Sequence, residues 1–239
     1  MTIPQSRKRR GKLLIGLLVA GLVVVLTGLG IWQVQRLGWK TDLIERVEAR
    51  LASAASDAPG PSVWPALDQK ADEYTRVTVT GEYLPGSDAL VMAVTEHGGG
   101  YWVMSPLRTS DGWILWINRG FVPQDRSTPA NRPLPDGEQQ ISGLLRMSQP
   151  GGAFLRSNDP AGNRWYSRDV VALSASRGID EAAPYFIDAA RRNGDALPIG
   201  GLTVVTFRNA HLGYAITWFA LAAGLAVASF IFLRREWRD

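Results

Sequence analysis

The sequence predicts an integral membrane protein of the α+β class, in which two transmembrane helices flank one mainly antiparallel β domain. Three observations carry this prediction. Two long uncharged runs lie near the ends of the chain, basic residues flank both runs, and the stretch between them alternates like short β-strands. The bulk composition of the 239 residues, 46% hydrophobic and 20% charged, hides this segregation.

The two apolar runs are residues 13–31 and 212–233. At about 1.5 Å of rise per residue they reach about 28 and 33 Å, close to the hydrocarbon thickness of about 30 Å. The first run also resembles a cleavable signal peptide, whose apolar region is usually about 7 to 15 residues long and ends at a small-x-small site. The nearest such site, at 52–54, lies far downstream. Retention of 13–31 as an anchor is therefore the favoured reading.

Basic residues predict the orientation, because short basic flanks stay on the cytoplasmic side. The tails 1–12 and 234–239 contain these cations: Arg7, Lys8, Arg9, Arg10, Lys12, Arg234, Arg235 and Arg238. We therefore expect a multi-pass protein of the bacterial inner (cytoplasmic) membrane with both termini in the cytoplasm. Residues 32–211 would form its periplasmic domain.

Charge and cysteine content exclude several function classes. Without the two tails, 18 basic and 20 acidic residues remain, a net charge of about −2. Nucleic-acid binding needs clustered cations on the folded surface and loses its support. The chain has no cysteine, which excludes disulfides, thiolate metal sites and thiol catalysis.

Residues 32–55 are expected to continue the first helix out of the membrane as a stalk. An apolar stripe of Leu37, Ile44, Val47 and Leu51 has helical spacing. Trp32, Arg36 and Trp39 gather near the membrane surface, where amphipathic aromatics and long cations settle. Three prolines in 57–65 then end the helix.

The period changes to two after Tyr74, which predicts a curled or barrel-like sheet. A tight hairpin is expected at 110–112, and Gly81 suggests a bulge or a sharp bend. Residues 169–177 are predicted to form a short helix with Asp169 as its N-cap. The predicted strands are 74–84, 89–95, 101–108, 112–120, 139–148 and 201–207, with 184–188 as a further candidate.

The chain offers little for catalysis, and we expect no enzyme. No nucleophile elbow, HExxH motif or nucleotide fingerprint is present. His97 lies in a Gly-rich stretch and is best explained as a solvated turn residue.

His211 stands where the second span enters the membrane. On a helix, Tyr214, Ala215 and Trp218 share its face. This stripe is consistent with an interfacial aromatic belt, or with a site that holds a haem through the imidazole. The small residues Ala220, Gly224 and Ala228 on this helix, with Gly16 and Ala20 on the first, predict close helix packing.

Four segments together resemble the surfeit-locus (Surf or Shy) family of cytochrome c oxidase assembly factors, in order from Gly28 to Phe219. They are GLGIWQVQRLGWKTDLIERVEARL, YTRVTVTGEY, the run from GGGYWVMSPL to GWILWINRGFVP, and RNAHLGYAITWF.

The resemblance implies a chaperone of the respiratory chain that assists haem a insertion into subunit I of the oxidase. Bacterial relatives are thought to bind haem a and pass it from haem A synthase to subunit I. His211 then matches the family's transmembrane histidine, a possible ligand of the haem iron, with Tyr214 and Trp218 beside it. The other matched positions are Trp32, Gln33, Arg36, Asn118, Arg119 and Gly120. Arg119, expected at a hairpin end, would contact a haem propionate or a partner, or order a turn; the structural role is favoured.

Two rival functions remain open. The protein could be a cofactor-free membrane scaffold that stabilises partially built oxidase subunits. A membrane-bound periplasmic hydrolase is disfavoured, because no nucleophile and base can be paired.

Overall fold

The computed structural model describes residues 5–153, 155–191, 196–205 and 209–236. The chain divides into two compact units, Met1–Arg46 with Thr206–Asp239 and Val47–Val205. Helix α1 (Gln5–Ala52) begins in the first unit and ends in the second. The side chains of the N-terminal basic cluster, and Arg238 of the C-terminal tail, lie outside the described residues.

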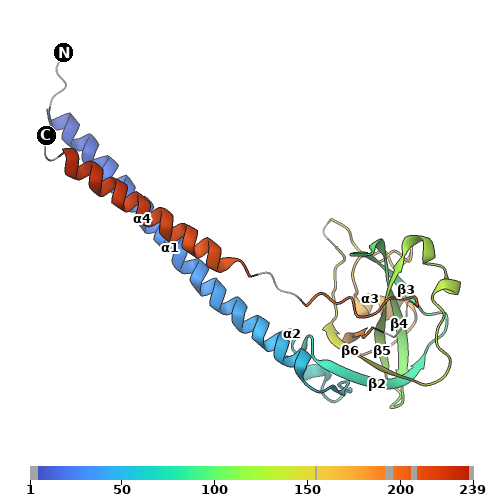
Figure 1. Cartoon of the computed structure of the whole chain (residues 1–239). Helices are drawn as coiled ribbons and strands as arrows, with labels where there is room; N and C mark the ends of the chain where they lie inside the picture. Colours follow the sequence, from blue (N-terminus) through green and yellow to red (C-terminus); the bar gives the residue numbers. More distant parts are fainter. Residues whose placement is uncertain (1–4, 154, 192–195, 206–208, 237–239) are drawn as a thin grey trace. The chain divides into compact units, whose positions relative to one another are not determined.

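The helical unit pairs α1 with α4 (His211–Glu236) in antiparallel orientation (Figure 1). Both helices are long and apolar enough to cross a membrane, over Leu14–Ala52 and His211–Arg235. The hydroxyls of Thr27, Thr217 and Ser229 each donate to the carbonyl four residues earlier in the same helix. The helices thereby satisfy these polar groups without water, as an apolar surrounding requires. The prediction of two apolar terminal helices around a sheet domain is confirmed.

The other unit is built on a mixed sheet, seven-stranded over the described residues. Five strands close into a ring, because β2 pairs with β6, β6 with β7, β7 with β5, β5 with β4, and β4 with β2 again. The strands are β1 (Ser56–Asp57), β2 (Arg76–Tyr83), β3 (Ala89–Thr95), β4 (Gly98–Thr109), β5 (Ile114–Pro123), β6 (Gln139–Met147) and β7 (Tyr185–Ala189). The expected barrel-like sheet is therefore present, with parallel β1–β2 and β5–β7 pairs that the sequence did not reveal.

Two glycines explain how the ring turns its corners. The predicted hairpin joins β4 to β5, and Gly112 takes a φ of 93° in its turn. Gly81 is the residue where β2 passes from β6 to β4. A Cβ there would lie 2.3 Å from the carbonyl oxygen of Arg108, so Gly81 permits a close approach of two backbones.

The core lies on both sides of β5. Leu115 and Ile117 point into the ring, where a cluster from all five ring strands is buried. Trp116 points the other way, into a second cluster with Phe186 and the helix residue Leu173. A strand buried on both faces reads as a continuous apolar run, as ILWI does here.

Helix α3 (Val170–Ser176) covers the outer side of β5. The side chain of Asp169 accepts from the backbone N–H of Ala172, so the predicted helix and its N-cap are confirmed. The Trp116 Nε1 atom donates to the Ser174 hydroxyl at 2.9 Å, which fixes the indole against the helix.

Two sequence predictions need correction. The strand expected at 201–207 is absent over the described residues 201–205, which join no ladder, and 206–207 lie outside the described part. Two β-branched residues of this segment have other roles: Val204 is exposed, and Thr203 donates a hydrogen bond to Asp188. Helix α1 ends at Ala52 rather than 55, and the next residues add β1 to the sheet in parallel with β2.

Candidate functional site

In the described part of the helical unit, a buried glutamine of α1 is hydrogen-bonded to a half-buried histidine of α4. His211 Nδ1 lies 2.7 Å from Oε1 of Gln33, which is only 9% exposed on α1. His211 opens α4 and faces α1 across this bond. The structure thus brings together two of the residues singled out from the sequence, far apart in the chain.

Near this pair, small residues let helices α1 and α4 pack closely. Ala215 and Ala222 of α4 are buried, and Gly30 of α1 receives the ring of Phe219, which lies 2.6 Å from where a Cβ would stand. The series expected to pack, Ala220, Gly224 and Ala228, is exposed instead. The buried small residues at the α1–α4 contact are therefore other ones, whereas Gly16 of α1, which the pattern did indicate, is half-buried.

The aromatic residues near His211 differ in exposure. Trp218 is half-buried on the same face as His211 and Ala215. Tyr214 is 58% exposed and so lies at the edge of that face. On α1, Trp32 is exposed, and the Arg36 guanidinium stacks over the Trp39 ring at 4.1 Å.

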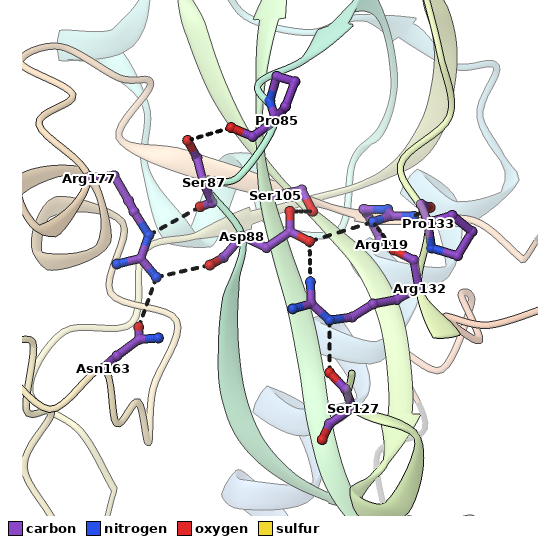
Figure 2. A network of polar contacts seen from close by, with 10 residues as sticks. All are labelled: Pro85, Ser87, Asp88, Ser105, Arg119, Ser127, Arg132, Pro133, Asn163 and Arg177. Atoms are coloured by element: carbon purple, nitrogen blue, oxygen red, sulfur yellow. Dashed lines mark hydrogen bonds and ion pairs between the residues drawn. The ribbon is translucent and has the colours of Figure 1, made fainter. Parts of the chain in front are cut away.

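The other marked positions, Asn118, Arg119 and Gly120, lie within β5 in the barrel unit. Arg119 is a mid-strand residue rather than the hairpin-end residue expected. It is 6% exposed, donates to the backbone carbonyls of Arg132 and Pro133, and lies 3.9 Å from Asp88 (Figure 2). Arg119 thus joins β5 to the loop before β6.

Asp88 is the centre of that cluster, as Figure 2 shows. Its carboxylate accepts from the Ser105 hydroxyl at 2.6 Å and from Arg132, while its backbone carbonyl accepts from Arg177 at 2.9 Å. Arg177 also donates to Asn163 at 2.8 Å. The cluster therefore holds three loops against the sheet.

Asn118 belongs to a second cluster, centred on Asp188 of β7. Asn118 donates to Asp188 Oδ1 at 2.7 Å, and Arg168 donates to the same oxygen at 3.0 Å. Arg146 and Thr203 donate to Oδ2, each at 2.9 Å. Asp188 is 5% exposed, so its charge is compensated by four donors rather than by water.

Burial shapes the titration of the two arginines in this cluster. Desolvation lowers the pKa of the Arg168 guanidinium, and the nearby Asp188 opposes this effect. Desolvation acts on Arg146 in the same direction, but attraction by Asp188 and then by Tyr74 and Glu73 raises its pKa. Both groups keep their positive charge at neutral pH.

Gly120 is the last of the three β5 residues that the family resemblance singled out. Its φ is 128°, and a Cβ would lie 2.3 Å from the backbone of Ile199, with which Phe121 exchanges two hydrogen bonds. Only glycine allows this contact between β5 and the segment after β7.

Sequence reasoning missed Asp188, Arg146 and Asp88. A signal existed for the first two, because each is a charged residue at an alternating position inside an apolar strand. Among the described residues, no group of three or more His, Asp or Glu side chains is placed to hold a metal ion.

Comparison with known proteins assigns the chain to a family. A model of the SURF1 family matches residues 20–223. The SURF1-like protein of Monosiga brevicollis is 35% identical over 98% of this chain and 92% of its own length. Surfeit locus protein 1 of Xenopus tropicalis is 35% identical, over 82% and 68%, and that of Homo sapiens is 34% identical, over 82% and 70%. The resemblance read from the sequence is confirmed, and the chain belongs to the SURF1 family.

Proposed function

We propose that this protein is a membrane-anchored assembly factor for cytochrome c oxidase that holds haem a through His211 and passes it to subunit I. The observation that carries the proposal is the hydrogen bond between His211 and the buried Gln33. Haem a is cargo in this account, and haem A synthase is its source.

Gln33 can prepare His211 for iron. When the side-chain oxygen of Gln33 accepts from Nδ1–H, the lone pair of the ring lies on Nε2. Metal-bound histidines are usually oriented in this way by a second hydrogen bond, which also raises their basicity. No described side chain hydrogen-bonds to Nε2 itself. The pair would thus offer one oriented imidazole nitrogen to a haem iron.

The surroundings suit a large apolar ligand. Next to His211, α4 carries the half-buried Trp218 and the exposed Tyr214, whose aromatic rings could lie against a porphyrin. The exposed aliphatic side chains of both helices are those expected of lipid contact. Arg234 and Arg235 in the last turn of α4 favour a cytoplasmic end, with the barrel unit in the periplasm of a bacterial inner membrane.

The test compares the two histidines of the chain. Wild-type protein, His211→Ala and His97→Ala would each be co-produced with haem a, purified in detergent through a tag without histidine, and assayed for haem per chain. His97 lies in the exposed turn between β3 and β4 and provides a matched control. We expect a Soret band in the wild type and in His97→Ala and none in His211→Ala. Stoichiometric haem in His211→Ala would contradict the assignment.

A second candidate function is a cofactor-free scaffold that holds oxidase subunits through its helices. Exposed glycines favour it, because a Cβ at Gly28, Gly213 or Gly224 would meet no described atom within 4 Å. Such positions let a further helix approach closely. Subunit I that co-purifies equally with wild type and with haem-free His211→Ala, but is lost from Gly224→Ile, would favour this function over haem transfer.

A further inference from the structure

A cavity of about 230 Å³ lies beside the Asp188 cluster, and all of its lining residues belong to the barrel unit. One wall is polar and includes Arg146, Arg168 and Asp188. The rest of the lining includes the apolar side chains of Trp102 and Val204. None of the proposed roles of this protein uses this cavity.

The hydrogen bonds of the two arginines leave one donor group on each. Arg146 donates through Nε to Glu73 at 3.1 Å and through Nη1 to Asp188. Arg168 donates through Nε to Gln149 at 3.1 Å and through Nη1 to Asp188. Within the described chain, neither Nη2 donates to a protein acceptor. Each guanidinium therefore keeps one amino group without a described protein acceptor, and both arginines line the cavity.

Asp188 cannot accept further hydrogen bonds from the Nη2 groups of Arg146 and Arg168. A carboxylate offers about four lone-pair positions, and Asn118, Arg146, Arg168 and Thr203 already occupy four. Asp188 instead fixes both guanidinium planes through their Nη1 atoms. What remains of the hydrogen-bonding capacity of the two arginines toward the cavity consists of donors, so its ligand must be an acceptor.

A carboxylate fits these donors best. Arginine forks match the planar, two-oxygen geometry of a carboxylate, and charge-assisted bonds of this kind are the strong ones. A bound anion would also compensate the desolvation of Arg168, which is 14% exposed at its side chain. A strongly hydrated dianion such as phosphate is less suited, because Trp102 and Val204 cannot replace its water.

The apolar wall defines the rest of the ligand. The indole of Trp102 is half-buried, and the Arg168 guanidinium lies 5.8 Å from its ring centroid. An aromatic body placed against Trp102 would bring a carboxylate that it carries toward Arg168. The cavity is smaller than the roughly 300 to 1,000 Å³ of drug-sized sites, so it suits one ring or one acidic arm.

We infer that this cavity is a binding site for a carboxylate carried on an aromatic body. Benzoate is the probe, and benzamide, its neutral counterpart of the same shape, is the control ligand. Both would be titrated calorimetrically into the full-length protein in detergent. Benzoate is expected to bind one-to-one with a chain, and benzamide is not. Absence of benzoate binding, or equal binding of the two, would overturn the inference.

Two variants locate the site. Arg168→Lys keeps the charge toward Asp188 but loses the fork, and we expect it to weaken benzoate binding about tenfold or more. Arg177→Lys makes the same change in the Asp88 cluster and should leave the affinity unchanged. Unchanged affinity in Arg168→Lys refutes the site. If Arg168→Lys does not fold, Trp102→Leu replaces it under the same criterion.

A third comparison identifies the source of the carboxylate, a small free acid or the acidic arm of a larger molecule. It uses His211→Ala, which removes the proposed iron ligand and should bind benzoate like the wild type. Displacement of benzoate by haem, but not by its dimethyl ester, assigns the site to a propionate arm. Displacement by neither assigns it to a free acid, and displacement by both overturns the carboxylate assignment.

Discussion

The helix pair and the barrel treat buried polar side chains in opposite ways. The barrel gathers them into clusters, in which Asp88 and Asp188 each accept from several donors. At the described contact between α1 and α4, the buried Gln33 is hydrogen-bonded to the half-buried His211, among alanine, glycine and aromatic groups. Barrel clusters therefore fix loops and strands, whereas the proposed function assigns a ligand to the isolated pair of the helices. Variants in the two units should differ accordingly.

The largest effect is expected from Asp188→Ala in the barrel. The change leaves Arg146 and Arg168 buried without their shared anion, which typically costs about 3–5 kcal/mol. Chemical denaturation of the barrel would measure it. Asp159→Ala, in a loop, serves as control and should lower the stability far less. Equal stabilities of the two variants would contradict the central role given to Asp188.

Gly120→Ala should come next. Its Cβ would collide with the backbone of Ile199 in a strained conformation, so we expect a loss of about 3 kcal/mol. Gly112 also has a positive φ, but a Cβ there would meet open space. Gly112→Ala should therefore lower the free energy of unfolding by only about 1 kcal/mol. Thermal unfolding of the two variants separates steric collision from backbone strain. If Gly120→Ala lost no more stability than Gly112→Ala, the strand would tolerate the added Cβ by shifting its backbone.

Gln33→Leu should sharpen the comparison from the side of the helices. It removes the orienting hydrogen bond of His211 and should weaken haem retention about 10- to 100-fold, as such supporting residues do. Barrel stability should stay unchanged. Gln35→Leu, at an exposed position on the same helix, is the matched control. Equal haem retention in Gln33→Leu and Gln35→Leu would mean that Gln33 does not orient the histidine.

The smallest effect concerns an exposed acid. The backbone N–H of Gly162 and, less strongly, Arg164 lower the pKa of Asp159 below its usual 3.8. Because the folded-state pKa is depressed, its stabilising contribution is present above pH 3.8 and is lost as the pH falls through the folded value. Thermal unfolding of Asp159→Asn should therefore differ slightly from the wild type at neutral pH and converge with it in acid. Curves that stay parallel at all pH values would contradict this.

Local pattern was enough to predict much of the fold. Alternation located the strand from Ala89 to Thr95 at its observed bounds, and Asp169 marked the start of α3. The parallel pairing of β5 with β7 could not be read in this way, because it joins segments separated by about 60 residues and leaves no local signal. Residues 201–205 had a strand-like composition, but no ladder partner lies beside them.

The candidate site was predictable only in part. Resemblance to a family singled out His211 and Gln33. These residues are 178 positions apart in the sequence, and their contact depends on the packing of the two helices that carry them. The Asp188 cluster combines residues from three strands and two connecting segments, so sequence spacing could not assemble it. Arg119, by contrast, was singled out by the family resemblance, and in the structure its hydrogen bonds order a loop.

The central claim is that His211 ligates the iron of haem a. With two histidines in the chain, His97→Ala leaves His211 alone. This variant, labelled with ¹⁵N-histidine, would be loaded with haem a and studied in the ferric state by electron–nuclear double resonance. The account predicts a ¹⁵N coupling of an axial imidazole. A haem-loaded protein without that coupling would contradict it.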